Sequence, residues 1–361
     1  MGERRGEQSA RADSLSAGLP VLLKRHLPGL RGEPKLERLP GDASNRQYYR
    51  VQADEKRFIL MRVMDDSPAK VFEEKTELKK VDELPFVNVH RFLSAIAVPV
   101  PKIHVWDPGF GLMLLEDWGD LMLEGVVQTG DWARIRPLYE KCLDAMVRLQ
   151  VEGTRQIGEG TIAYHQRFNV PLLVWEFDHF LEYGVDVRGG REMEPADRKQ
   201  VRAVFQKLAE EIEGQPRVLT HRDFHSRNVM VLPGDEIGLI DFQDALMGPV
   251  TYDLASLLRD AYVTLPEEMV DSLVEGFLSR REKAGAERLD HQTFRRMFDV
   301  CSIQRNLKAA GRFVFIEKKK GNPKFLKHIP PVLAYVKRNL AKYPELVPAL
   351  EALRKYVPEL A

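Results

Sequence analysis

Four polar residues in one stretch of the chain have the types and spacing that phosphoryl transfer requires. His221, Asp223 and Asn228 form a His-x-Asp-x-x-x-x-Asn pattern, and Asp241 follows the asparagine after a short interval. A carboxylate and an amide oxygen suit a hard ion such as Mg²⁺, so Asn228 and Asp241 are candidate metal ligands. Asp223 is placed to accept the proton of a substrate hydroxyl, which makes it the candidate catalytic residue. The alternative is an N-capping aspartate and a turn asparagine on an ordinary loop.

The segment between Asn228 and Asp241 predicts a hairpin that brings these two residues together. Val229 to Leu232 is an apolar run, Pro233-Gly-Asp235 is a turn sequence, and Gly238 to Ile240 is a second apolar run. Short apolar runs separated by turn residues are typical of paired strands.

The stretch His221-Arg-Asp-Phe-His-Ser-Arg-Asn228 resembles the H-x-D-x-H-x-x-N signature of the aminoglycoside phosphotransferase and choline kinase-like family. The resemblance implies an α+β, bilobal protein-kinase-like fold that uses ATP and Mg²⁺. Gln243 stands where protein kinases have the glycine of Asp-Phe-Gly, and His225 is unusual in protein kinases. Both departures favour a small-molecule kinase.

The expected division of the chain follows from this resemblance. We expect a tail and short helix over residues 1–35, a small β-rich, nucleotide-binding N-lobe over 36–117, and a larger helical C-lobe over 118–361. Within the C-lobe, apolar residues recur at helical spacing over 131–151, 168–183 and 195–212.

Two stretches before the catalytic segment are candidates for nucleotide contacts. The run Gly41-Asp-Ala-Ser44-Asn45 can offer backbone N–H groups to phosphates, as a nest does, and a plain hairpin turn is the alternative. Leu115-Glu116-Asp117 closes an apolar run and resembles the hinge strand of the family, whose backbone would hydrogen-bond the adenine ring. The alternative there is a buried strand that ends in a turn.

The strand expected over 57–63 lacks the lysine with which kinases hold the α- and β-phosphates. Arg62 is the nearest cation, and strand alternation places it on the same face as Phe58. A solvated position on an edge strand is the alternative for Arg62. The helix expected over 86–97 contains no acid to pair with such a cation, and the insert from Asp65 to Glu83 is interpreted as a solvated helix or a flap.

Several residues around the catalytic stretch receive supporting roles. His221 is expected to be structural, and His225 either orients Asp223 or Asp241 or simply packs in the loop. Gln243 and Asp244 follow the metal ligand and could face the acceptor. The resemblance implies that Asp253 accepts backbone N–H groups of the catalytic loop.

A more detailed resemblance concerns the acceptor. Four stretches resemble the anomeric kinases of N-acetylmuramate and N-acetylglucosamine, which act in cell-wall recycling: residues 41–50, 241–245, 248–254 and 304–313. Gln304 and Lys308 lie on one helical face with Arg305 beside them, and such cations would suit the lactyl carboxylate of N-acetylmuramate. Arg227 and Arg312 could contribute, and a solvated basic helix face is the alternative.

The composition limits the classes of partner that we expect this protein to bind. Of 361 residues 44% are apolar, and 54 lysines and arginines balance 54 acids, which gives no reason to expect nucleic acid or a membrane as a partner. Two distant cysteines indicate neither a disulfide framework nor a thiolate metal site and fit a reducing cytoplasm. We expect a small sugar as substrate and see no sign of an obligate protein partner, while the oligomeric state stays open.

Three functional hypotheses remain after this reading. The first is an ATP- and Mg²⁺-dependent kinase of an N-acetylated amino sugar, or of another small hydroxylated metabolite such as an aminoglycoside, a choline-like alcohol or another sugar. The second is a nucleotide-binding regulator with weak catalysis, which the missing strand lysine motivates. The third, a protein kinase, is disfavoured by Gln243.

Overall fold

The computed structural model describes residue 15 and residues 18–26, 33–39, 46–63 and 83–361. The chain divides into two compact units, one formed by Met1–Lys75 and Val100–Asp120 and the other by Thr76–Pro99 and Leu121–Ala361. The helix expected near residue 86 therefore groups with the second unit. Among the residues that the structure describes, no helix is both long and apolar enough to cross a membrane.

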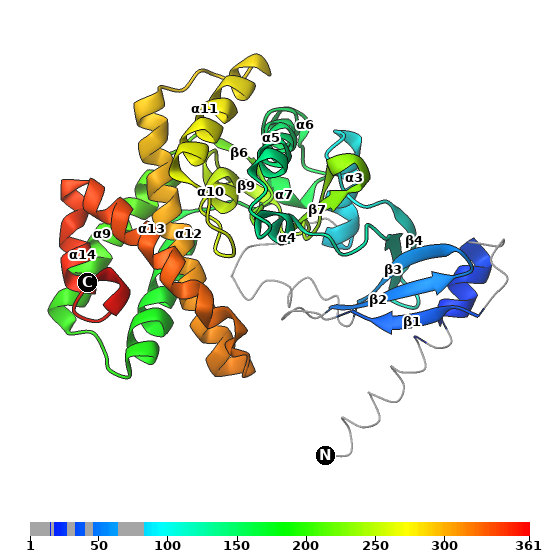
Figure 1. The fold of residues 1–361 in the computed structure, drawn as a ribbon, viewed down its shortest axis with the longest axis horizontal. Helices are drawn as coiled ribbons and strands as arrows, with labels where there is room; N and C mark the ends of the chain where they lie inside the picture. The colour runs from blue at the N-terminus through cyan, green and yellow to red at the C-terminus, as the bar shows by residue number, and fades with distance from the viewer. Residues whose placement is uncertain (1–14, 16–17, 27–32, 40–45, 64–82) are drawn as a thin grey trace. The chain divides into compact units, whose positions relative to one another are not determined.

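The first unit is built on an antiparallel sheet of five strands in the order β1-β2-β3-β5-β4, of which β1, β2 and β3 lie side by side in Figure 1. The strands are β1 (Lys35–Arg38), β2 (Arg46–Ala53), β3 (Lys56–Val63), β4 (Ile103–Asp107) and β5 (Leu112–Glu116). The turn Asp54–Glu55 joins β2 to β3, and Asp54 takes a positive φ there, which short polar residues tolerate. β3 and β5 are interior strands, and most of their side chains are buried.

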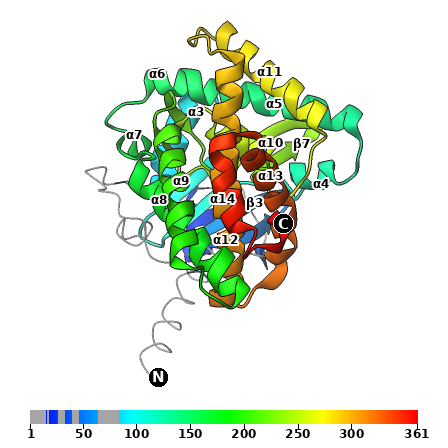
Figure 2. The same ribbon diagram turned by 90° about the vertical axis from the view of Figure 1, so that its left-hand side faces the viewer.

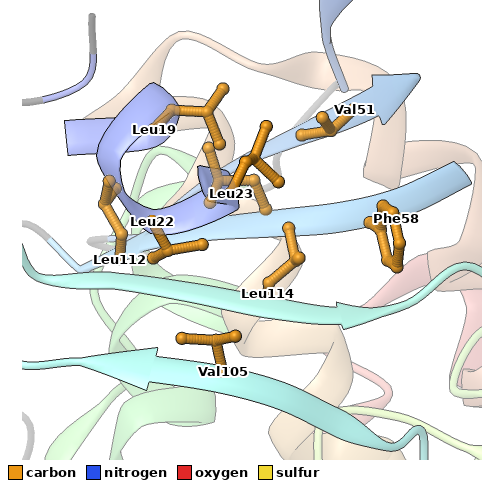
Figure 3. Close-up of a cluster of buried hydrophobic side chains, with 9 residues drawn as sticks. Leu19, Leu22, Leu23, Val51, Phe58, Val105, Leu112 and Leu114 are labelled. Carbon is orange, nitrogen blue, oxygen red and sulfur yellow. The ribbon is translucent and has the colours of Figure 1, made fainter. Parts of the chain in front are cut away.

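One face of this sheet packs against a helix over residues 18–26. Leu19, Leu22 and Leu23 of the helix point toward the sheet, where Phe58 and Leu114 lie beneath them (Figure 3). All of these side chains are at most 5% exposed, so the helix closes the apolar core of the unit. The short helix expected before residue 35 is thus confirmed for its described part.

The second unit is mainly helical. Its α-helices are α3 (Pro85–Ala95), α4 (Leu123–Val127), α5 (Trp132–Arg148), α6 (Thr154–Gln156), α7 (Ile162–His165), α8 (Val170–His179), α9 (Pro195–Glu213), α10 (Tyr252–Leu258), α11 (Glu267–Lys283), α12 (His291–Lys320), α13 (Ile329–Lys342) and α14 (Val347–Leu353). The π-helical segments η1 (Leu149–Gly153) and η2 (Phe180–Val187) extend α5 and α8. Side-chain caps mark several starts, since Asp131, Asn169 and Asp290 accept N–H groups of α5, α8 and α12.

The long helix α12 is the centre of the second unit. Figures 1 and 2 show α13 beside it, and Figure 2 shows α8 and α9 side by side. Gly311 allows the close approach of α12 to η2, because a Cβ there would lie 2.8 Å from the Cα of Phe180. This contact sets how α8 and α12 face each other.

Two small strand pairs frame the catalytic stretch. β6 (Arg217–Thr220) pairs with β9 (Leu246–Pro249), and β7 (Val229–Leu232) pairs with β8 (Glu236–Leu239) through the turn Pro233–Asp235. The predicted hairpin is confirmed. Gly234 occupies the left-handed region with φ of 77°, which explains the glycine in this turn.

Candidate active site

The catalytic loop runs from the end of β6 to the start of β7 and is anchored by two buried carboxylates. Asp253, in the first turn of α10, accepts the backbone N–H groups of His221 at 2.6 Å and Arg222 at 2.9 Å. Asp260 accepts the N–H of Ser226 at 2.7 Å. Burial raises the pKa of Asp253 to about 7, although the two N–H donors act in the opposite direction. These contacts hold the loop on both sides of Asp223.

Two non-glycine residues of the site take left-handed backbone conformations. Arg222 has φ of 79° and Asp241 has φ of 63°. Such conformations cost free energy and persist where the surrounding structure imposes them, often at functional sites. Arg222 precedes the predicted catalytic residue Asp223, and Asp241 is itself a predicted metal ligand.

Asp223 presents a half-exposed carboxylate beside positive charge. Its side chain is 38% exposed, and its Oδ1 lies 3.7 Å from Nη2 of Arg305. Burial by itself would raise the pKa of Asp223, but the charges of Lys308 and Arg305 outweigh that effect and hold the pKa below its usual range. The group is therefore an anion at neutral pH, able to accept a hydrogen bond from a hydroxyl group and to orient it for attack.

The two predicted metal ligands are brought together by the hairpin. The N–H of Ile240 donates to the carbonyl of Asn228 at 3.0 Å, which ties the residue before Asp241 to Asn228. Nδ2 of Asn228 donates to the carbonyl of Asp223 at 2.9 Å, so the amide oxygen of Asn228 remains for a cation. Asp241 is exposed, and one of its oxygens accepts Nε2 of Gln243 at 2.8 Å.

This oxygen pair fits Mg²⁺ held jointly with phosphate oxygens. No cluster of three or more His, Cys, Asp or Glu side chains among the described residues could hold a metal by itself. Mg²⁺ commonly takes one or two protein carboxylates and completes its shell with water and substrate phosphates. The residues present therefore suit a metal that arrives with a nucleotide.

Gln243 and the two histidines are structural parts of the loop. Gln243 is buried, and its Nε2 donates to both Asp241 and Asp244, at 2.8 and 3.1 Å, so it orients two carboxylates, while its contact with the acceptor stays a prediction. Burial raises the pKa of Asp244. Burial lowers the pKa of His221 to about 4, which leaves its ring neutral. His225 lies 3.4 Å from Nδ2 of Asn228 and packs edge-on against Tyr262, which favours loop packing among its two interpretations.

The predicted acceptor helix is α12, and its polar residues differ in their burial and in the groups that they contact. Gln304 is fully buried and donates to Glu176 of α8, so its side chain is engaged within the protein, and its contact with the acceptor stays a prediction. Lys308 forms an ion pair with the same Glu176 and lies 3.5 Å from the hydroxyl of Tyr252. Arg305 stacks over the ring of Tyr252 and donates to the carbonyl of Arg222 at 2.7 Å. The alternative of a solvated helix face is excluded by this burial.

The remaining cations suggested for the acceptor are engaged elsewhere. Arg227 binds both oxygens of Glu124, at 2.8 and 2.9 Å, and lies 3.8 Å from the centre of the Tyr262 ring. A guanidinium held in this way links the catalytic loop to α4, and its contact with a substrate carboxylate stays a prediction. Arg312 stacks on Phe315.

The candidate nucleotide contacts lie in the first unit or outside the described residues. Ser44 and Asn45 are outside them, as is the insert up to residue 82. Arg62 is 7% exposed on an interior strand, so the solvated-edge alternative is wrong, while its contact with phosphate stays a prediction.

Several groups of the hinge segment, residues 115–117, already form hydrogen bonds within the protein. The N–H of Glu116 donates to the carbonyl of Lys102 at 2.9 Å and is therefore not available to an adenine ring. The carboxylate of Asp117 binds Arg50 at 2.9 Å and the N–H of Gly119. Leu115 is paired within the sheet on both sides. Any contact of this segment with adenine must therefore use other backbone atoms.

The chain is matched by the model of the phosphotransferase enzyme family (APH) over residues 35–290. It belongs to that family. An N-acetylmuramate/N-acetylglucosamine kinase of Pseudomonas putida is 30% identical over 84% of this chain and 83% of its own length. The enzyme of the same name from Pseudomonas aeruginosa is 31% identical over 89% of this chain and 88% of its own.

Membership of the phosphotransferase enzyme family confirms the enzyme class and the fold. The structure of a choline/ethanolamine kinase family protein from Mesorhizobium loti shares the fold with a TM-score of 0.58 at 16% identity, covering 96% of this chain and 99% of its own. The α+β protein-kinase-like fold is thus confirmed, with a β-rich smaller unit and a larger helical unit. The chain is a phosphotransferase that acts on an alcohol group.

Sequence reasoning missed three carboxylates that organise the site. Glu176 and Asp260 are buried, and Glu124 holds Arg227. Glu176 lies in an apolar helical stretch, Val-Trp-Glu-Phe, where an acid at a core-facing position is an available signal. Asp260 lies seven residues after Asp253, but its partner in the catalytic loop has no local sequence signature.

Proposed function

We propose that this phosphotransferase uses ATP and Mg²⁺ to phosphorylate the anomeric hydroxyl of N-acetylmuramate or N-acetylglucosamine. The observation that carries the proposal is the 30–31% identity, over most of both chains, to kinases named for these two sugars. The site supports it with an anionic Asp223 and two oxygen ligands for a metal.

The roles of the residues follow from their contacts. Asp223 would accept the hydrogen bond of the anomeric hydroxyl, and Asn228 and Asp241 would hold a Mg²⁺ ion, which would supply positive charge to the phosphates. Lys308 and Arg305 are the cations on the acceptor side of Asp223, where they can meet the sugar or its lactyl carboxylate. Arg62, Ser44 and Asn45 are proposed for the phosphates, and the segment 115–117 for adenine.

The reducing cytoplasm is the proposed location. Both cysteines are free and buried, as expected of a protein that does not depend on disulfides. ATP for the reaction and sugars released during cell-wall recycling would meet there.

The identity of the product tests the proposal. The full-length protein would be incubated with ATP, Mg²⁺ and each sugar, and the product examined by phosphorus NMR with proton coupling. A phosphate coupled to the anomeric proton is expected, and it should form much more slowly with Asp223→Asn. Phosphate on another hydroxyl, or turnover only with choline or an aminoglycoside, would refute the acceptor assignment and retain the kinase. No ATP consumption with any acceptor would favour a nucleotide-binding regulator.

A further inference from the structure

Arg281, in the last turns of α11, is a buried cation that forms no ion pair with an acid among the described residues. It is 6% exposed, and its Nε and Nη1 groups are shielded from solvent and make no hydrogen bond there. Its guanidinium carbon lies 5.8 Å from the centre of the Phe277 ring, which is a weak cation–π contact and supplies no counter-charge. A guanidinium keeps its charge at every ordinary pH, so the residue cannot relieve this burial by losing a proton.

Two other arginines of the described chain, the fully buried Arg259 and the partly buried Arg295, show what is missing at Arg281. Arg259 is fully buried and binds both oxygens of Glu267, at 2.8 and 2.7 Å. Arg295 is paired with Asp271 and Asp299. A buried charge is stable when a counter-charge and hydrogen bonds accompany it, and strongly destabilising when they do not.

A small cavity lies at Arg281. It has a volume of about 110 Å³ and is bounded by the end of α11, the connection to α12 and the first residue of α12, His291. The volume is enough for several water molecules or one small anion. Arg288 and His291 on its wall can add positive charge or hydrogen-bond donors, and Leu278 and Leu289 exclude water from part of it.

Three glutamates also line this cavity, and they are the alternative source of a counter-charge. Glu275, Glu282 and Glu287 are all exposed, so their carboxylates are solvated. None of the three forms an ion pair with Arg281. The buried guanidinium therefore remains without a carboxylate from the described chain.

We propose that this cavity is a binding site for a small oxyanion, of the phosphate or carboxylate class, with Arg281 as its anchor. The planar guanidinium matches the oxygen geometry of such ions, which it can bind through two hydrogen bonds. The bound anion would connect the end of α11 to the start of α12, the helix that carries Arg305 and Lys308. The site is separate from the metal ligands and stands independently of the proposed acceptor.

The test measures the thermal unfolding midpoint of the full-length protein against anion concentration. Phosphate, sulfate and acetate would each be titrated at constant ionic strength, balanced with chloride. The variants are Arg281→Met and the control Arg280→Met, whose neighbouring guanidinium is already paired with Asp144. If Arg281→Met does not fold, Arg281→Gln, which removes the charge but keeps a donor, takes its place.

For the wild type and Arg280→Met we expect a saturable rise of the midpoint by several degrees with at least one oxyanion. Arg281→Met should lack this rise, and in oxyanion-free buffer it should unfold no earlier than the wild type, because it has no unpaired buried charge. An equal rise in Arg281→Met would place the anion elsewhere, for example at the phosphate site of the kinase, and would overturn the proposal. So would the absence of any rise beyond chloride.

The glutamates require one further comparison. Glu275→Gln, Glu282→Gln and Glu287→Gln would each be made in the wild type and in Arg281→Met. If one of them lowers the midpoint only when Arg281 is present, that glutamate is the counter-charge and no external anion is needed. If all three leave the oxyanion response intact, the proposal stands.

Discussion

At the scale of single residues, the carboxylate of Asp223 is a weak base. Its pKa lies below the usual range because Lys308 and Arg305 are close, so it orients the acceptor hydroxyl more than it draws the proton away in the ground state. Replacing Asp223 by Asn keeps the shape but removes the charge. We expect the turnover number to fall about 100-fold or more with little change in nucleotide affinity. Asp178→Asn, on the surface of α8, is the matched control, and a turnover number within a few-fold of wild type would remove Asp223 from the mechanism.

The metal ligands make a second prediction at this scale. Asp241 supplies a charged oxygen and Asn228 a neutral one, so replacing them should reduce activity to different extents. Asp241→Ala should abolish Mg²⁺-dependent activity, and Asn228→Ala should raise the Mg²⁺ concentration needed for half-maximal rate. Titration of initial rates with Mg²⁺ separates the two effects. Normal turnover of Asp241→Ala at low Mg²⁺ would contradict the metal assignment.

Lys308 links the acceptor side of the site to its pH dependence. Its positive charge lowers the pKa of Asp223, so in the wild type Asp223 becomes protonated only well below neutral pH. Lys308→Met removes that charge, raises the pKa of Asp223, and should move the acid limb of the kcat/KM profile to higher pH. Glu176→Gln leaves the charge of Lys308 in place, so it should not produce this upward shift but should raise KM for the sugar.

The pH profiles of the two variants, recorded from about pH 4 to 8 beside the exposed control Lys319→Met, test this assignment. Superimposable acid limbs for wild type and Lys308→Met would show that Lys308 does not act on Asp223. An upward shift in Lys319→Met as well would indicate a general charge effect of α12.

At the scale of elements, the contact between α12 and η2 positions the acceptor side of the site. Gly311→Ala would place a Cβ 2.8 Å from the Cα of Phe180 and 3.2 Å from the carbonyl of His179, and backbone atoms cannot move aside as a side chain can. The helices must separate, which should cost about 1–3 kcal/mol of stability. Because Glu176 of α8 binds Gln304 and Lys308 across this contact, activity should fall as well.

Gly276→Ala on α11 is the control for this prediction. Its Cβ would lie 3.0 Å from the flexible end of Arg280 and at an ordinary contact distance from Leu143, so we expect unchanged or slightly higher stability, by up to about 1 kcal/mol. Urea unfolding and initial rates of both variants provide the comparison. Equal stability of Gly311→Ala and wild type would show that the close approach is not required.

At the scale of the whole molecule, nucleotide and metal should stabilise the fold together. A ligand that binds only the folded state adds about 2.7 kcal/mol at a concentration of 100 times its Kd. We expect ATP with Mg²⁺ to raise Tm more than ATP with EDTA, and Asp241→Ala to lose the difference. Differential scanning calorimetry of the full-length chain measures it. A Tm that rises equally with and without the metal would contradict a metal-bridged nucleotide.

The local part of the site could be predicted from the chain alone. A loop, a hairpin and a second loop follow from the spacing of His221, Asp223 and Asn228 and from the turn before Asp241. These contacts join residues that are close in the sequence, so they depend little on how the rest of the chain folds. The apolar periodicity of α5, α8 and α9 likewise predicted helices at their observed places. The anchoring of the catalytic loop by Asp253 was expected from the family resemblance and is present in the structure.

The tertiary structure decided which polar residues of α12 are available and which are occupied. Gln304 and Lys308 share a helical face and both bind Glu176 of α8, yet Gln304 is fully buried whereas a quarter of the Lys308 side chain stays exposed. Arg227 is held by Glu124, more than a hundred residues earlier in the chain. Whether a charged side chain is paired, buried or free depends on distant segments that pack around it, and neither residue type nor local spacing carries that information.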